Sequence, residues 1–202
     1  MHLSTWIAFC VTETVLCLMP GPAVLLVVSS AAGRGARVGL GAALGILAAN
    51  TVYFALSATG VVAAHAASRD LFVIIRWIGA GYLVWIGLHM HRPRHARGGA
   101  APPVVLSHPF VRGFVVQIAN PKAVAFFVAL LPQFINPASS VAEQVLILGA
   151  SSLVIELVVL AGYAEGASRA RDLVSERFAG VMRQVGGALL VALGVRLALL
   201  SS

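Results

Sequence analysis

Six long apolar segments alternate with short polar ones along this chain. They lie at about 5–28, 38–64, 71–90, 111–134, 143–164 and 178–200. Each segment is close to the length of roughly 20 residues that an α-helix needs to cross the hydrocarbon core of a bilayer. The pattern therefore predicts an all-α polytopic membrane protein with six transmembrane helices.

The composition agrees with this interpretation. Of the 202 residues, 59% are apolar and 10% are charged, whereas about a quarter of the residues of an ordinary soluble domain are charged. Six spans would occupy most of residues 1–202, so we expect a single transmembrane domain whose longest connection is a cytoplasmic loop at about 91–110. No basic region precedes the first apolar segment, and we expect it to be retained rather than cleaved as a signal peptide.

Basic residues exceed acidic ones by 14 to 7 and gather in alternate loops. The arginines of the first, third and fifth loops are Arg34, Arg37, Arg92, Arg94, Arg97, Arg112, Arg169, Arg171, Arg177 and Arg183. Because basic residues near the ends of spans stay in the cytoplasm, we expect loops 29–37, 91–110 and 165–177 to be cytoplasmic and both termini to lie outside. The arginines form no basic face with aromatic platforms, so nucleic acid is not an expected partner.

Two of the predicted helices contain proline inside the apolar segment. Pro20-Gly21-Pro22 interrupts the first, and Asn120-Pro121 interrupts the fourth. Proline lacks the N–H that continues a helix and glycine adopts unusual dihedral angles, so we expect both helices to be broken. With three spans per half, the halves would be inverted repeats, and paired breaks in such halves indicate a binding site near the membrane midplane. Packing kinks are the structural alternative.

Three ionisable residues lie within the predicted spans: Glu13, Lys122 and Glu156. Charged groups inside a membrane are costly, and they commonly serve function. Removal from water favours the neutral form of a carboxylate, whereas a nearby cation favours its charged form, so Glu156 and Glu13 are candidates for proton coupling. Lys122 is the cation within reach of an acid or of a substrate carboxylate. A structural ion pair between two helices is the alternative.

Further polar residues could line a pathway. Asn50, Tyr53 and Ser57 share one face of the second predicted helix, where either substrate binding or hydrogen bonding between helices would use them. Gln117 and Gln133 flank the second break. The candidate substrate-binding residues are Pro20, Gly21, Pro22, Asn50, Asn120, Pro121, Lys122 and Gln133.

Other patterns in the sequence indicate packing or solvent exposure. The spacings from Gly35 to Gly39 and from Gly41 to Gly45 are those that let helices touch. The histidines near the long loop have no cysteine or carboxylate to complete a metal site, so we expect a solvated linker and no metal. We find no nucleophile elbow, P-loop or dinucleotide fingerprint, and therefore expect no enzyme activity and no cofactor.

Four motifs, read together, resemble those of one transporter family. They are residues 20–26 (PGPAVLL), 78–87 (IGAGYLVWIG), 120–123 (NPKA) and 131–134 (LPQF). In this order and spacing, which covers nearly the whole chain, they resemble the LysE/RhtB family of amino-acid exporters, of the homoserine/threonine efflux type. The resemblance implies six transmembrane helices in a bacterial inner membrane, export of amino acids or their derivatives driven by the proton gradient, and a substrate path beside both proline breaks.

The chain departs from that family pattern at two places. Family members often carry Asp or Asn directly after the first proline motif and an acid near the middle of the second span, where this chain has Ala23 and Asn50. Fewer acids make a neutral substrate, such as homoserine, threonine, homoserine lactone or leucine, a more natural ligand than lysine or arginine.

The leading hypothesis is thus a secondary transporter that exchanges an amino acid for protons. A passive channel or a non-transporting membrane subunit is the alternative. A membrane thiol-disulfide electron carrier is disfavoured, because Cys10 and Cys17 both lie on the first predicted helix. The expected partners are an amino acid, protons and the lipid bilayer, and a homodimer is left open.

Overall fold

The protein is a bundle of helices in which two long helices pack against each other and against two broken ones. The structure, a computed structural model, describes residues 1–67 and 108–169 together with Trp77, Gly81, Val84, Leu88, Val191, Ala192 and Val195. Helices are the only regular elements among the described residues, which confirms the all-α class. Most residues of the predicted spans 71–90 and 178–200 and of loop 91–110 lie outside the described residues, so the count of six stays a prediction.

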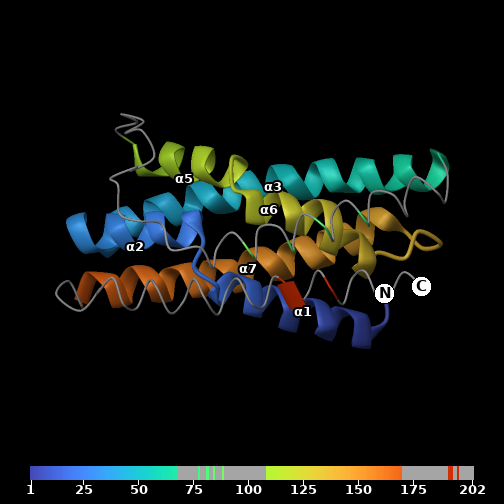
Figure 1. Cartoon of the computed structure of the whole chain (residues 1–202), viewed down its shortest axis with the longest axis horizontal. Coiled ribbons are helices and arrows are strands. Elements are labelled where there is room, and N and C mark those ends of the chain that lie inside the picture. The colour runs from blue at the N-terminus through green and yellow to red at the C-terminus, as the bar shows by residue number, and fades with distance from the viewer. Residues whose placement is uncertain are drawn as a thin grey trace.

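The bounds of the helices in the described residues are as follows. They are α1 (Leu3–Leu18), α2 (Pro22–Arg34), α3 (Ala36–Ala67), α5 (Pro109–Ile118), α6 (Pro121–Ala125), the π-helix η1 (Phe126–Leu130), the 3₁₀-helix η2 (Leu131–Phe134) and α7 (Val141–Arg169). Figure 1 shows α3 and α7 running along the bundle, while the two broken helices change direction near its middle.

Both proline interruptions bend the chain where the sequence places them. The axes of α1 and α2 differ by 53°, and those of α5 and the segment Pro121–Phe134 differ by 49°. Each bent pair is long and apolar enough to be one broken span, and residues Ala36–Ala58 of α3 and Val141–Arg169 of α7 satisfy the same test as single helices. The described residues therefore hold two to four candidate spans.

The prediction that residues 29–37 form a loop is wrong. Helix α2 continues to Arg34 and α3 begins at Ala36, so only Gly35 separates them. Gly35 has a φ of 92°, a value that side-chain-bearing residues rarely adopt, and its N–H donates to the Ala31 carbonyl at 2.8 Å. One glycine thus reverses the chain. Helix α7 likewise extends to Arg169, into the predicted loop 165–177, because polar residues continue a helix beyond its apolar part.

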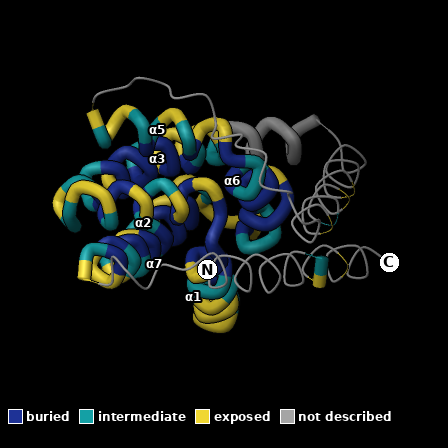
Figure 2. Tube along the Cα trace, turned by 60° about the vertical axis from the view of Figure 1, so that its left-hand side comes forward, coloured by how far each residue is buried: buried dark blue, intermediate teal, exposed yellow. Residues whose placement is uncertain are grey.

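The bundle buries several polar side chains within its apolar core and exposes many apolar ones. Buried polar side chains come from every long segment: Glu13, Ser30, Asn50, Gln117, Asn120, Gln144, Ser152 and Glu156. On α7 the face opposite Ser152 and Glu156 exposes Leu146, Val154 and Val158, and exposed positions surround the buried interior in Figure 2. This distribution suits a lipid environment, where apolar side chains need no burial and polar ones do.

Two glycines allow α3 and α5 to touch through their backbones. A Cβ atom added at Gly45 would lie 1.9 Å from the Phe110 carbonyl oxygen, and one added at Gly113 would lie 1.9 Å from the Ala42 carbonyl oxygen. The spacing Gly41 to Gly45 therefore serves close helix packing, as predicted. This contact fixes the second half's broken helix against the first half's long helix.

We predict that Gly45→Ala and Gly113→Ala each destabilise the protein by about 1–3 kcal/mol, because the helices must move apart to admit the methyl group. Thermal unfolding in detergent should show a melting temperature lowered by about 2–4 °C per kcal/mol. Gly162→Ala on α7 is the matched control, since nothing lies within 4 Å of its added Cβ. Equal melting temperatures for Gly45→Ala and Gly162→Ala would refute the backbone contact.

Candidate functional site

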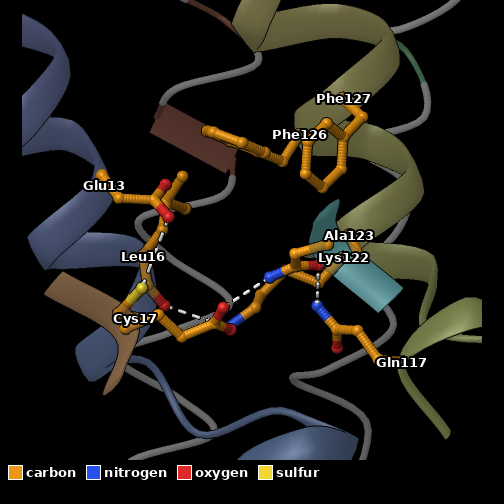
Figure 3. Close-up of a pocket in the computed structure, with 10 residues that line it drawn as sticks. Glu13, Leu16, Cys17, Gln117, Lys122, Ala123, Phe126 and Phe127 are labelled. Atoms are coloured by element: carbon orange, nitrogen blue, oxygen red, sulfur yellow. Dashed lines mark hydrogen bonds between the residues drawn. The ribbon is translucent and has the colours of Figure 1, made fainter. Parts of the chain in front are cut away.

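A pocket lies where the two broken helices meet α3 and α7. Its volume is about 40 Å³, which is room for a few water molecules. The lining residues are Glu13, Leu16, Cys17, Asn50, Gln117, Lys122, Ala123, Phe126, Phe127 and Glu156. Figure 3 shows Glu13 and Cys17 on α1 across the pocket from Gln117 and Lys122. The pocket thus combines two carboxyl groups, one ammonium group and an apolar wall.

Lys122 joins the two breaks. It is the second residue of α6, and its Nζ donates to the Leu16 carbonyl at 2.9 Å and to the Met19 carbonyl at 3.0 Å. These carbonyls belong to the end of α1, where Pro20 and Pro22 cannot supply N–H donors. A cation is also favoured at the negative end of the helix dipole. No ion pair joins Lys122 to Glu13 or Glu156, so the predicted structural ion pair is not the contact that Lys122 makes.

A row of amides connects the second break to Glu156. The Lys122 backbone N–H donates to Asn120 Oδ1 at 3.1 Å, and Asn120 Nδ2 donates to Gln117 Oε1 at 2.9 Å. Gln117 Nε2 donates to Asn50 Oδ1 at 2.7 Å, and Asn50 Nδ2 donates to Glu156 Oε2. In each of the three amides the oxygen accepts from one neighbour and the nitrogen donates to the next, which fixes the orientation of all three. The row spans α6, α5, α3 and α7, and it couples the break to a buried carboxyl group.

Glu13 has a separate set of partners. Its Oε1 accepts a hydrogen bond from Ser152 Oγ on α7 and a weaker one from Cys17 Sγ at 3.6 Å. The two acids of the pocket therefore come from opposite halves of the chain, and each is bonded to a neutral side chain on a neighbouring element. Neither carboxyl group is neutralised by a cation at ion-pair distance within the described residues.

Two tyrosines donate to further carbonyls at the open helix ends. Tyr53 on α3 donates to the Ile118 carbonyl at 2.7 Å, and Tyr163 on α7 donates to the Leu18 carbonyl at 2.8 Å. Each hydroxyl reaches from the long helix of one half to the broken helix of the other. Main-chain oxygens left by the breaks thereby gain partners that do not depend on water.

The π-helix η1 places two neighbouring aromatic rings at the pocket. Phe126 and Phe127 are both buried, although adjacent residues of an α-helix point about 100° apart. The wider turn lets both rings line the pocket; π-helical turns often occur at functional sites. The Tyr53 ring stacks on Phe127, with 4.8 Å between centroids, so the apolar wall is held by α3.

Comparison with known proteins identifies the family. The model of the LysE type translocator family matches residues 14–201. The chain belongs to the LysE type translocator family. A Vibrio cholerae protein described as an uncharacterized membrane protein is 32% identical over 201 residues, covering 98% of both chains. The homoserine/homoserine lactone efflux protein of Salmonella typhimurium is 31% identical, covering 84% of this chain and 83% of that protein.

A further relative carries a different substrate in its name. The leucine efflux protein of an Enterobacter species is 36% identical over 124 residues, 59% of this chain and 58% of that protein. No solved structure matches the chain. The protein is therefore a LysE-type membrane protein with relatives among amino-acid efflux proteins, and the resemblance found from its motifs is confirmed.

The predicted site residues of this LysE-type translocator are distributed unevenly around the pocket. Glu13, Asn50, Lys122 and Glu156 line it. Pro20, Gly21, Pro22, Asn120 and Pro121 do not line it, but they form the breaks that shape it, and Asn120 belongs to the amide row. Gln133 is not brought to the pocket: its Nε2 donates to the Ala129 carbonyl at 2.6 Å.

From the sequence alone, Gln117 could not be distinguished from Gln133 as a residue of the pocket. Both glutamines flank the second break, but only Gln117 is buried between Asn120 and Asn50. The i, i+3 spacing from Gln117 to Asn120 was the available signal, because it puts both amides on one helix face. Within the described residues, no three His, Cys, Asp or Glu side chains group to hold a metal ion.

The amide row predicts energetic coupling between Asn50 and Gln117. Asn50→Leu should lower the free energy of unfolding by about 1–3 kcal/mol, because Glu156 and Gln117 lose a buried partner. A double-mutant cycle with Gln117→Leu, followed by thermal unfolding, should give a coupling energy of about 0.5–3 kcal/mol.

Gln133→Leu is the control for this cycle, because Gln133 shares no hydrogen-bond partner with Asn50. Its effect should add to that of Asn50→Leu within about 0.5 kcal/mol. If Gln117→Leu is just as additive, the row does not couple the two residues.

Proposed function

We propose that the protein is a secondary transporter that exports neutral amino acids or their derivatives from the cytoplasm in exchange for protons. The observation that carries this proposal is a pocket at the junction of two broken helices in a LysE-type translocator, lined by one ammonium and two buried carboxyl groups. The names of the relatives, homoserine/homoserine lactone efflux and leucine efflux, give the expected substrate class.

The pocket's chemistry favours a small zwitterion with an uncharged side chain. Lys122 is the ammonium group for a carboxylate, while carbonyl oxygens and carboxyl groups on α1 and α7 suit a substrate ammonium group. The side chain would lie against Leu16, Phe126 and Phe127, which offer no charge. A cationic side chain would need a further acid, and both acids of the pocket already accept hydrogen bonds from neighbouring side chains.

Glu156 is the proposed proton carrier. It lines the pocket, so a substrate and a proton could reach it alternately, and Asn50 ties it to the break that carries Lys122. Glu13 accepts hydrogen bonds from Ser152 and Cys17 and is proposed to support the substrate ammonium group. In the simplest form of antiport, a buried carboxyl group takes up a proton when it is open to one side of the membrane and releases it when it is open to the other side.

The halves are proposed to be inverted repeats that rock about the pocket. Tyr53 reaches from the first half to the broken helix of the second, and Tyr163 reaches from the second half to that of the first. This reciprocal exchange is what a pseudo-two-fold axis in the membrane plane would produce. Six spans, both termini outside and a bacterial inner membrane complete the proposal.

Everted membrane vesicles with an acidic interior should accumulate labelled leucine or homoserine, because their outer face is the cytoplasmic one. We predict that Glu156→Gln lowers accumulation driven by the pH gradient at least tenfold while exchange of labelled for unlabelled substrate continues. The glutamine amide can still form hydrogen bonds, but it cannot take up and release a proton as a carboxyl group does.

Glu165→Gln is the matched control, since Glu165 is an exposed acid on the same helix that pairs with Arg169 at 3.3 Å. It should accumulate substrate like the unchanged protein. Full gradient-driven accumulation by Glu156→Gln would exclude this acid as the carrier. Flux that neither saturates nor responds to the gradient in the unchanged protein would favour the passive channel.

A further inference from the structure

Lys122 occupies a position that an ammonium group of a ligand could take. Its Nζ lies 2.9 Å from the Leu16 carbonyl oxygen and 3.0 Å from the Met19 carbonyl oxygen, and Leu16 itself lines the pocket. A primary ammonium group donates up to three hydrogen bonds, so an α-amino group would satisfy the same two oxygens. Nothing in this contact requires that the ammonium belong to the protein.

A carboxylate is favoured next to the same place. Helix α2 has 13 residues, begins at Pro22 and has no side-chain cap at Gly21. A Cβ atom added at Gly21 would lie 3.8 Å from Lys122 Nζ, so the positive end of the α2 dipole lies beside the lysine. The break in the first span thus places carbonyls of α1 on one side and the start of α2 on the other. The carbonyls suit the ammonium group of a zwitterion, and the start of α2 suits its carboxylate.

We propose, on the basis of the function proposed above, that the Leu16 and Met19 carbonyls are the ammonium subsite and that Lys122 fills it when no substrate is bound. The substrate's ammonium group takes over the two carbonyls, and its carboxylate becomes the new partner of the displaced Lys122 beside the start of α2. Charge is conserved in this exchange, and no covalent bond changes. Lys122 is then both a stand-in for the substrate and a determinant of its class.

This exchange explains why the ligand must carry both groups. A simple amine would displace Lys122 and leave its ammonium group without an acceptor, and a simple carboxylic acid would draw Lys122 away and leave two carbonyls without a donor. Unpaired groups of either kind are costly in a buried site. An amino acid satisfies both partners at once.

The exchange also alters the connection between the two halves. Lys122 on α6 bonds directly to the end of α1, so the direct link between the breaks is replaced by a link through the substrate. Substrate binding is thereby coupled to the contact about which the halves would move.

The test uses chemical rescue of the purified, full-length protein. In Lys122→Ala, the two carbonyls lose their donor, and the space of the lysine side chain is left open for a ligand of the same length. Butylammonium should raise the melting temperature of this variant by at least about 3 °C. Tetramethylammonium, which has no N–H, and butyrate at equal ionic strength should not. The unchanged protein should show no selective response to butylammonium, because its own ammonium group fills the subsite.

Arg169→Met is the matched control, since it removes an exposed cation far along α7 from the residues of the pocket, and it should respond like the unchanged protein. If Lys122→Ala does not fold, Lys122→Ser leaves the same space open and is measured in the same way. Equal responses to butylammonium and tetramethylammonium would overturn the proposal, as would stabilisation of the unchanged protein by butylammonium.

Binding and transport failures are distinguishable by these experiments. Selective rescue by butylammonium in a protein that exports no amino acid would retain the subsite and reject the proposed export. Export by the unchanged protein, together with no selective rescue of either Lys122 variant, would retain the proposed function and reject the exchange.

Discussion

Main-chain groups that lose their helical partners inside an apolar bundle must find others, and this requirement organises the whole site. The prolines at 20, 22 and 121 end two helices among residues that are otherwise apolar. Water cannot supply the missing partners in hydrocarbon, so side chains do. Lys122, Tyr53 and Tyr163 donate to the open carbonyls, and each reaches them from a different helix.

The same requirement accounts for the pocket's position and its polarity. Helices that bend by 53° and 49° cannot pack along their whole length, and the space at the bends is bordered by the groups recruited to satisfy them. Close contact through Gly45 and Gly113 holds the surrounding helices firmly. The result is a cavity with both charged and apolar lining, inside a bundle that exposes many apolar side chains.

The sequence predicts local features of this structure well and relative placement less well. Proline always lacks the backbone N–H, so both breaks could be located from the sequence. Glu13, Asn50 and Glu156 could be selected as candidates because burying polar side chains in apolar segments is costly. Gln117 and Gln133 could not be ranked, because the bend and the π-helix between them decide which one turns inward. The single-residue turn at Gly35 was also missed, since arginines at helix ends resemble a loop.

Transport by the proposed mechanism requires that the breaks border a cavity that the substrate reaches, and chemical labelling at Ala123 measures this access. Ala123 is buried and lines the pocket, whereas Leu146 is 72% exposed on the apolar face of α7. In a protein whose two native cysteines are replaced by alanine, Ala123→Cys should react with a small water-soluble methanethiosulfonate. Its reaction should slow in the presence of the transported amino acid, and Leu146→Cys should not react. An Ala123→Cys thiol as unreactive as that of Leu146→Cys, from both sides of the membrane, would contradict the account.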